Sequence, residues 1–470
     1  MKRKLLVSFL LLTGQCHAQT LQQHLQTAFN KLQQDSQCRY ASVSLTVLDA
    51  KTGQQVFAAN PNMGLATAST LKVITAVTAF NLLGKDFQYK TQFGYSGTIA
   101  ADGTLNGSLI IKGGGDPTLG SWRWATTREQ YILNLLVNAL QKAGIKKING
   151  SVIGDDSAYG TQAIPDGWIW QDIGNYYGAG ANALCWHENQ FDIKLKTGAV
   201  GTPISVLRTV PVMPYLVFKS EVLNAPEGTG DKAYVYLPAG GKLMYLRGTY
   251  ATDQTKKTVS AALPDPAYDV ALRLTDTLNR LGIKISGEPQ STITLAIKDE
   301  LAPAITKELT TIASPELSKM VYWLNQKSLN LYAEEFLKTI AQKAGKEPTT
   351  PNGVKVLQDF WKAKGIDPAT LNIFDGCGLS PGNRVTTLTM ARVLQSAKKE
   401  SWYSYFYDSL PIYNDMKMKS GSISDVLAYS GYQTYKGRDL CFSFIVNNYN
   451  GSTKGIKEKM FKVLNEMKIP

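Results

Sequence analysis

The four residues from Ser69 to Lys72 constrain this chain more than any other stretch of its sequence. A serine is a weak nucleophile until a base removes its proton, and a lysine three positions later lies on the same face of a helix. An apolar environment lowers the pKa of such a lysine towards the range of a general base, and a helix start offers N–H groups to an oxyanion. The residues that follow predict a core helix: Leu71, Ile74, Val77, Ala79 and Leu82.

Ser-x-x-Lys is short enough to arise by chance, and the chain contains a second copy from Ser396 to Lys399. That copy lies in a charged stretch typical of a solvated helix end, so we assign it to the surface. Without support from elsewhere, Ser69 is only slightly favoured over a serine that merely caps a buried helix.

Two further motifs supply that support. Ser328-Leu329-Asn330 is the only Ser-x-Asn in the chain and lies in a predicted helix, and Lys419-Ser420-Gly421 precedes a stretch of small residues. A Ser-x-x-Lys, a Ser-x-Asn and a Lys-Thr-Gly motif together mark penicillin-binding proteins and serine β-lactamases. Serine in place of threonine at position 420 keeps a hydroxyl donor at the same reach.

Two literal Lys-Thr-Gly triplets compete with Lys419, namely those that begin at Lys51 and at Lys196. The first lies between two strand-like runs, and the second closes an alternating run, so both are typical of turns. Lys419 instead leads into small residues whose backbone a ligand can approach closely, and we favour it.

The order of the motifs resembles the S13 peptidase family, the D-alanyl-D-alanine carboxypeptidases/endopeptidases of the penicillin-binding protein 4 type. The resemblance covers nearly the whole chain after its N-terminal segment. It includes Gly113–Leu119, Gly154–Tyr159, Asp375–Ser380 and Ser430-Gly431-Tyr432. The family usually has serine at position 377, where this chain has Cys377, and threonine at position 420.

The resemblance implies a serine-type D-Ala-D-Ala carboxypeptidase that forms an acyl-enzyme on Ser69 and is inhibited by β-lactams. The same site would act as a D,D-endopeptidase on peptidoglycan cross-links. Lys72 would be the base, and Ser328 would relay the proton to the leaving amine, without any cofactor or metal. The groups that hold the substrate and the oxyanion would be Asn330, Lys419, Ser420, Gly421 and Ser422. The implied partners are peptidoglycan stem peptides and β-lactams.

Related enzymes place an acidic residue and an arginine around the diamino-acid side chain of the substrate. Asp155 and Arg384 match those positions best. A turn residue at 155 and a structural ion-pair partner at 384 are equally good interpretations, and both stay open here.

The N-terminus predicts export. Residues 1–18 have a basic start, an apolar run and a small-residue end at Ala18, the pattern of a secretory signal peptide. We expect no membrane span after it, because no later stretch approaches the ~20 apolar residues that a span requires. The expected location is periplasmic or otherwise extracytoplasmic.

The chain carries a formal net charge of +13, of which the predicted signal peptide holds three cations. A basic surface is compatible with contact with an anionic wall polymer or membrane headgroups, or with solubility alone. Without a basic run or a recognised binding motif, nucleic acid is not an expected partner.

Cysteine and histidine are scarce. Cys38, Cys185, Cys377 and Cys441 follow the signal peptide, and export permits disulfides among them, although free buried thiols are an equal alternative. Only two histidines, His24 and His187, follow it, and they are far apart. The sequence therefore disfavours a metal site and a Ser-His-Asp mechanism, which moves the base role towards lysine.

The predicted class is α+β, with a β-lactamase/transpeptidase-like catalytic domain, an antiparallel sheet flanked by helices, and a long, largely β insertion. The catalytic domain would comprise residues 19–92 and 303–470, and the inserted part residues 93–302. Short strands are expected in the insertion at Thr104–Lys112, Tyr234–Leu237 and Thr292–Ile297.

Three other functions share parts of this pattern. A serine β-lactamase would have all three motifs, but the long insertion matches carboxypeptidases. An esterase on the same scaffold would not need a cation at Lys419, and a non-catalytic cell-wall-binding protein would be expected to lose Ser69 or Lys72.

Overall fold

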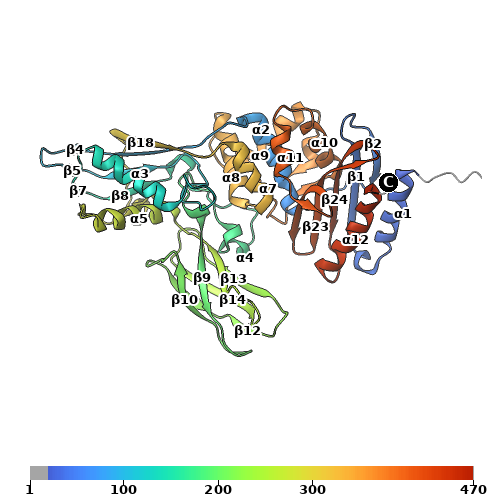
Figure 1. Cartoon of the computed structure of the whole chain (residues 1–470), viewed down its shortest axis with the longest axis horizontal. Coiled ribbons are helices and arrows are strands. Elements are labelled where there is room, and N and C mark those ends of the chain that lie inside the picture. Colours follow the sequence, from blue (N-terminus) through green and yellow to red (C-terminus); the bar gives the residue numbers. More distant parts are fainter. Residues whose placement is uncertain (1–19, 469–470) are drawn as a thin grey trace, which may run out of the picture.

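A computed structural model describes residues 20–468, so the predicted signal peptide lies outside the described residues. One end of the elongated molecule is built on a six-stranded antiparallel sheet with the order β2-β1-β24-β23-β22-β21 (Figure 1). Residues from both ends of the chain therefore meet in one sheet. Its strands are β1 (Ser42–Asp49), β2 (Gln55–Ala59), β21 (Ile412–Tyr413), β22 (Met416–Ile423), β23 (Val426–Tyr435) and β24 (Arg438–Asn447).

Helices cover both faces of this sheet, and its central strands are therefore buried almost throughout. On one face, α1 (Leu21–Gln33) and α12 (Thr453–Asn465) lie side by side and bury apolar side chains such as Phe29 and Met460 against the sheet. On the other face, α10 lies on β1 and β24, and the remaining helices pack behind it. This second layer contains α2 (Lys72–Leu83), α7 (Leu317–Lys327), α8 (Asn330–Lys343), α9 (Thr350–Ala363), α10 (Thr387–Ala397) and α11 (Tyr403–Ser409).

The predicted core helix after Ser69 is α2. Its residues from Lys72 to Phe80 are all buried, among them Val73, Ile74 and Val77 at 0% exposure. A short 3₁₀ turn, Ala68–Leu71, precedes it and carries Ser69.

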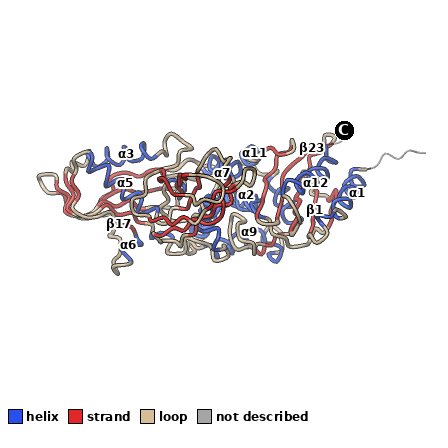
Figure 2. The backbone as a smooth tube through the Cα atoms, turned by 90° about the horizontal axis from the view of Figure 1, so that it is seen from below, coloured by secondary structure: helices blue, strands red, loops and turns tan. Residues whose placement is uncertain are grey.

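The chain leaves the catalytic sheet and its helices through β3 (Lys90–Tyr95) and returns through β18 (Lys307–Ala313), and these two strands pair antiparallel. The excursion forms two lobes, one around α3 and α5 and one built of strands, and Figure 2 shows how far the first extends from the helices. The strands, in their sheet orders, are β17-β8-β6-β3-β18, β16-β7-β5-β4, β10-β9-β15 and β11-β14-β12, with β13 beside β14.

The elements of the excursion and the short elements that follow it have the bounds β4 (Thr98–Ile99), β5 (Thr104–Asn106), β6 (Leu109–Lys112), α3 (Glu129–Lys142), β7 (Lys147–Asn149), β8 (Val152–Asp155), α4 (Trp170–Ile173), β9 (Gln190–Lys196), β10 (Ser205–Val210), β11 (Val217–Ser220), β12 (Leu223–Ala225), β13 (Asp231–Tyr236), β14 (Leu243–Ala251), β15 (Thr258–Ala262), α5 (Pro266–Arg280), β16 (Lys284–Ile285), β17 (Gln290–Ser291), α6 (Thr292–Ala296), β19 (Leu371–Asn372) and β20 (Arg384–Val385).

The α+β class, with an antiparallel sheet flanked by helices and a largely β insertion, is confirmed. Of the three strand predictions, Thr104–Lys112 contains β5 and β6, and Tyr234–Leu237 overlaps β13. The domain boundaries at 93 and 302 stay a prediction, since residue 93 lies inside β3 and residue 302 lies just before β18.

Two local predictions are wrong. Thr292–Ile297 is not a strand, because Ser291 accepts a hydrogen bond from the Thr294 amide while the Thr294 hydroxyl accepts one from the Ser291 amide, a capping box that starts α6. Ser328 does not lie inside a helix. It ends α7 in the left-handed conformation (φ 56°, ψ 45°), and α8 begins at Asn330.

Within residues 20–468, none of the helices combines the length and the apolar character that crossing a bilayer demands.

Candidate active site

A cavity of about 430 Å³ opens between the helical layer, the edge of the catalytic sheet and the inserted lobes. The predicted residues on its wall come from separate elements, and they are Ser69, Ser328, Asn330 and Ser422. Residues 69, 328 and 422 are remote in the sequence, so the fold, and not local structure, brings them to one cavity.

Ser69 and Lys72 form a direct pair. The Lys72 ammonium donates a hydrogen bond to the Ser69 hydroxyl over 2.9 Å, because the turn and first helical residues place positions 69 and 72 on one face. Ala68, directly before the serine, has a positive φ of 44°, a conformation that non-glycine residues rarely adopt and that clusters at functional sites. The serine hydroxyl therefore faces the cavity, while its neighbour Lys72 is fully buried behind it.

Two more groups hold the Lys72 side chain. Its Nζ donates to Asn330 Oδ1 over 2.6 Å and to the Cys377 carbonyl over 2.8 Å. With Ser69, these acceptors match the three hydrogens of an ammonium, or the two hydrogens and one lone pair of a neutral amine whose lone pair points at the Ser69 hydroxyl. The second arrangement is the one a general base requires.

The left-handed residue Ser328 positions the second motif. Because it ends α7, the chain turns and places Asn330 in the first turn of α8, from where its side chain reaches Lys72. The Ser328 hydroxyl accepts a hydrogen bond from Lys419 Nζ over 3.0 Å, and Lys419 also donates to the Ser420 carbonyl over 2.6 Å. Lys419 is 1% exposed. It therefore lies behind Ser328 as Lys72 lies behind Ser69.

The third motif forms part of β22, which passes directly against the Ser69 turn. A Cβ atom on Gly421 would lie 2.6 Å from the Thr67 carbonyl oxygen and 2.7 Å from the amide nitrogens of Ser69 and Thr70. Only glycine permits this close approach. It brings the Ser422 end of the strand to the cavity beside the Ser69 amide, the arrangement needed for two backbone donors to one oxyanion.

The loop that supplies the Cys377 carbonyl is fixed by Asp375. One carboxylate oxygen of Asp375 accepts from the Gly378 amide and the Asn383 side chain, and the other from the Ser380 amide and the Trp168 indole. Thr75 on α2 adds a hydrogen bond to the Gly376 carbonyl. The loop is therefore anchored on several sides at the point where it meets Lys72.

Glu334 contacts the same loop from α8, one turn after Asn330, and its Oε1 accepts from the Gly376 amide over 2.9 Å. Its Oε2 is buried without a hydrogen-bond partner among the described residues. An ionised carboxylate there would be strongly disfavoured, and burial, helped by the charge of Asp375, raises the pKa of Glu334 to about 8. The protonated, neutral form of Glu334 is therefore favoured at pH 7.

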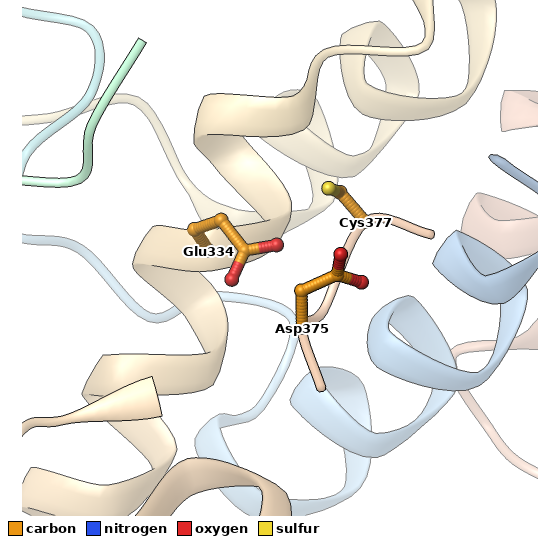
Figure 3. Close-up of side chains that lie close together, drawn as sticks. All are labelled: Glu334, Asp375 and Cys377. Atoms are coloured by element: carbon orange, nitrogen blue, oxygen red, sulfur yellow. The ribbon is translucent and has the colours of Figure 1, made fainter. Parts of the chain in front are cut away.

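Figure 3 shows the side chains of Glu334, Asp375 and Cys377 close together. One carboxylate oxygen of each acid and the Cys377 sulfur all lie within 4.8 Å of one another. Residues of these types can bind a metal cation, but the hydrogen bonds of this cluster leave no place for one. The four hydrogen bonds to Asp375 occupy the four lone-pair sites of its carboxylate and leave none for a cation. The cluster does not fit a metal and is instead the support of the Lys72 loop.

Burial lowers the pKa of both lysines. For Lys72 the acidic groups of Cys377, Asp375 and Glu334 oppose this shift. For Lys419 no acidic group opposes it, and the charge of Lys72 adds to it, so its pKa falls well below the ordinary value. Two adjacent buried amines disfavour each other's charge, and the site therefore favours holding at least one of them neutral.

The structure does not bring Asp155 and Arg384 to this cavity. Asp155 is buried at the end of β8. Its Oδ1 accepts a hydrogen bond from the Ser157 amide, and its Oδ2 lies 3.8 Å from Lys112 Nζ. Arg384 is exposed on β20 and donates to the carbonyls of Pro381 and Asn383. Neither lines the cavity of Ser69. Their assignment to the substrate stays a prediction without support from this geometry.

The four cysteines of the described part of the chain are free thiols, and all are buried. The alternative of buried free thiols, which the sequence left open, is therefore the one observed. His24 and His187 pair with Glu466 and Glu129, and neither histidine lines the cavity of Ser69.

Sequence reasoning missed several groups that shape the site. The Cys377 carbonyl and the Tyr177 carbonyl, which accepts from Asn330 Nδ2 over 2.7 Å, are backbone acceptors that no side-chain pattern announces. Only Glu334 has a sequence signal. An acidic residue four positions after Asn330, on the same helix face, is expected to share its surroundings.

Comparison with known proteins identifies the family of the chain. The model of the D-Ala-D-Ala carboxypeptidase 3 (S13) family matches residues 25–467. A D-alanyl-D-alanine carboxypeptidase of Actinomadura sp. is 24% identical over 87% of this chain and 78% of its own length. The D-alanyl-D-alanine carboxypeptidase DacB of Haemophilus influenzae is 26% identical over 83% of this chain and 82% of its own length.

Among solved structures, penicillin binding protein 4 of Haemophilus influenzae shares the fold. It superposes with a TM-score of 0.77 at 23% identity and covers 94% of this chain and 98% of its own. The family resemblance inferred from the motifs is confirmed, and the chain belongs to the S13 family of D-Ala-D-Ala carboxypeptidases, which are hydrolases of the peptidase class.

Proposed function

We propose that this protein removes the terminal D-alanine from peptidoglycan stem peptides that end in D-Ala-D-Ala, through an acyl-enzyme on Ser69. One observation carries the proposal. The amine of a fully buried lysine lies 2.9 Å from a serine hydroxyl that lines a cavity. The S13 family and the names of the similar proteins support the choice of substrate.

In the proposed acylation, Lys72 takes the proton of the Ser69 hydroxyl as the oxygen attacks the penultimate carbonyl carbon. The carbonyl becomes an oxyanion, which the amides of Ser69 and Ser422 stabilise; removal of one such donor commonly costs about 3 kcal/mol. The peptide C–N bond then breaks as Ser328 gives its proton to the departing amine of D-alanine and takes in exchange the proton that Lys72 accepted from Ser69. Water then attacks the ester, neutral Lys72 accepts a proton from that water, and this proton passes to the Ser69 oxygen as its bond to the acyl carbon breaks.

Lys419 is assigned two tasks. Its hydrogen bond to Ser328 keeps that hydroxyl in place for the proton relay. Its positive charge, together with the Ser420 hydroxyl, would meet the terminal carboxylate of the substrate. Because the pKa of Lys419 is lowered in the free protein, an incoming carboxylate would raise it, and substrate binding would be accompanied by proton uptake.

Asn330 completes the site. Its Oδ1 is occupied by Lys72 and one Nδ2 hydrogen by the Tyr177 carbonyl, which leaves the second Nδ2 hydrogen for a substrate amide. The same acylation would apply to β-lactams, which agrees with the name of the similar penicillin binding protein 4. Endopeptidase action on cross-links and export by the segment 1–18 belong to the proposal as predictions.

The test is the release of D-alanine from a stem pentapeptide. Wild type and Ser396→Ala, the serine of the second Ser-x-x-Lys copy, should release it at the same rate, because Ser396 only bonds the Val393 carbonyl at a helix end. Ser69→Ala should release none above the uncatalysed background. Equal activity in Ser69→Ala, or no activity in wild type, contradicts the proposal.

A further inference from the structure

A second cavity of about 640 Å³ adjoins the cavity of Ser69 in the strand-built lobe, on β9, β13 and β15. The two cavities share three wall residues, Tyr176, Tyr177 and Tyr234. A ligand too large for the first cavity would therefore enter the second by passing this tyrosine wall.

The tyrosine wall is fixed from both sides. On the side of Ser69, Asn330 Nδ2 donates to the Tyr177 carbonyl over 2.7 Å, and the Tyr177 hydroxyl donates to Asp172 over 3.2 Å. On the other side, the side-chain oxygen of Asn175 accepts the amide of Val235 on β13 over 3.0 Å. The same asparagine that holds Lys72 thus touches the partition between the cavities.

The second cavity carries charges of both signs. Asp192 and Lys194 form an ion pair over 3.0 Å. Ser260 donates a further hydrogen bond to Asp192, and Thr258 accepts one from Lys194. Asp231 and Lys256 are exposed on the wall of the cavity, and within residues 20–468 neither takes part in an ion pair, although Asp231 accepts a hydrogen bond from the Ala233 amide over 2.9 Å. Desolvation raises the pKa of Asp231, and the hydrogen bond from the Ala233 amide opposes this shift. The cavity therefore presents to a ligand one acidic and one basic side chain whose charges are not paired with each other or with another ionised group of the described residues.

This charge pattern selects among ligands. A polyanion would be repelled by Asp192 and Asp231, and an apolar ligand would strip water from four charged groups. A peptide that carries both an amine and a carboxylate satisfies Asp231 and Lys256 at once. Peptidoglycan stem peptides with a diamino acid have both groups. A cross-linked pair of stem peptides is branched, so it needs a second binding cavity beside the one that holds the scissile bond.

We propose that the second cavity binds the second stem peptide of a cross-linked peptidoglycan pair while the first cavity holds the bond that Ser69 attacks. This inference rests on the proposed function of the Ser69 site. It assigns the selectivity between cross-linked and single stem peptides to the strand-built lobe, through Asp231 and Lys256, and makes these positioning residues without contact with the reacting atoms.

The test compares two double variants on two substrates. Asp231→Asn/Lys256→Gln removes one acidic and one basic charge from the cavity wall. Glu227→Gln/Lys242→Gln removes the same two kinds of charge from equally exposed residues of the same lobe that do not line the cavity. We expect kcat/KM for a cross-linked muropeptide dimer to fall at least 10-fold in the first variant only. Release of D-alanine from a monomeric pentapeptide, and the rate of labelling by a fluorescent penicillin, should stay within twofold of wild type in both.

Three results would overturn the inference while the proposed function stands: wild type cleaves the monomer but not the dimer, the cavity variant loses monomer and dimer activity equally, or it loses neither. A wild-type protein that neither reacts with penicillin nor hydrolyses the monomer refutes the proposed function itself, and the inference falls with it.

Discussion

Replacement of Gly421 by alanine tests the packing of β22 against the Ser69 turn. The new Cβ would lie 2.6–2.7 Å from the Thr67 carbonyl oxygen and from the amide nitrogens of Ser69 and Thr70, whereas ordinary contact begins at 3.4 Å. All three neighbours are backbone atoms, so no side chain can rotate away. The strand and the turn would have to separate by roughly 0.7 Å.

This separation moves the Ser422 amide relative to the Ser69 amide, and the oxyanion would lose the alignment of its two donors. Misplacement of about 1 Å costs on the order of 10²-fold in rate, and loss of one oxyanion donor costs 10²–10³-fold. We therefore expect Gly421→Ala to lower the second-order rate constant of acylation by about 10²-fold. Overpacking should lower the free energy of unfolding by only about 1–3 kcal/mol, so the chain stays folded.

The assay is the rate of labelling by a fluorescent penicillin over a range of concentrations, with urea unfolding to confirm the fold. Gly64→Ala is the control, because its Cβ would meet only the Arg384 Cβ, at an ordinary 3.5 Å, and its backbone needs no positive φ. The control should label at the wild-type rate. If Gly421→Ala labels as fast as the control, β22 does not supply the oxyanion donor and the reasoning is wrong.

Three further predictions concern the support of Lys72. Lys72→Met, which keeps an unbranched side chain but lacks the terminal amine, should lower the rate of D-alanine release 10²–10⁴-fold with little change in far-UV circular dichroism; retention of half the rate would exclude Lys72 as the base. Asp375→Ala leaves four buried donors without their acceptor and should lower the free energy of unfolding in urea by at least about 4 kcal/mol; a loss below 1 kcal/mol would contradict the anchoring role. Glu334 has a pKa raised from 4.5 to about 8, so the folded state keeps a proton that the unfolded chain releases, and the stability of wild type should fall as pH rises through that window. Glu334→Gln should remove that fall, by up to roughly 5 kcal/mol between pH 4.5 and 8, and parallel pH profiles of the two proteins would refute the neutral carboxyl.

The sequence predicted the parts of the fold that depend on local pattern and on motif chemistry. The apolar run after Ser69 is α2, the core helix, and the triplets at Lys51 and Lys196 lie at a turn and at a strand end. The three motifs, remote along the chain, do converge on one cavity and on the two lysines behind it.

What the sequence could not show depends on contacts between distant backbone atoms. The alternation of Thr292–Ile297 predicts a strand, but the capping box at Ser291 starts a helix instead. The left-handed turn at Ser328 is set by how α7 and α8 pack, and a helical pattern runs through it without a break. The Cys377 carbonyl accepts a hydrogen bond from Lys72, and the Tyr177 carbonyl accepts one from Asn330. Every residue has a backbone carbonyl, so the identity of residues 177 and 377 does not predict these two contacts.

The central claim, that the Ser69 hydroxyl is the activated nucleophile, has a direct test. After brief exposure to benzylpenicillin, the intact mass should rise by that of one β-lactam, and the adduct should map to the tryptic peptide 52–72, whose single serine is Ser69. Ser69→Ala should gain no mass under the same conditions. An adduct on another peptide, or equal modification of Ser69→Ala, would contradict the account.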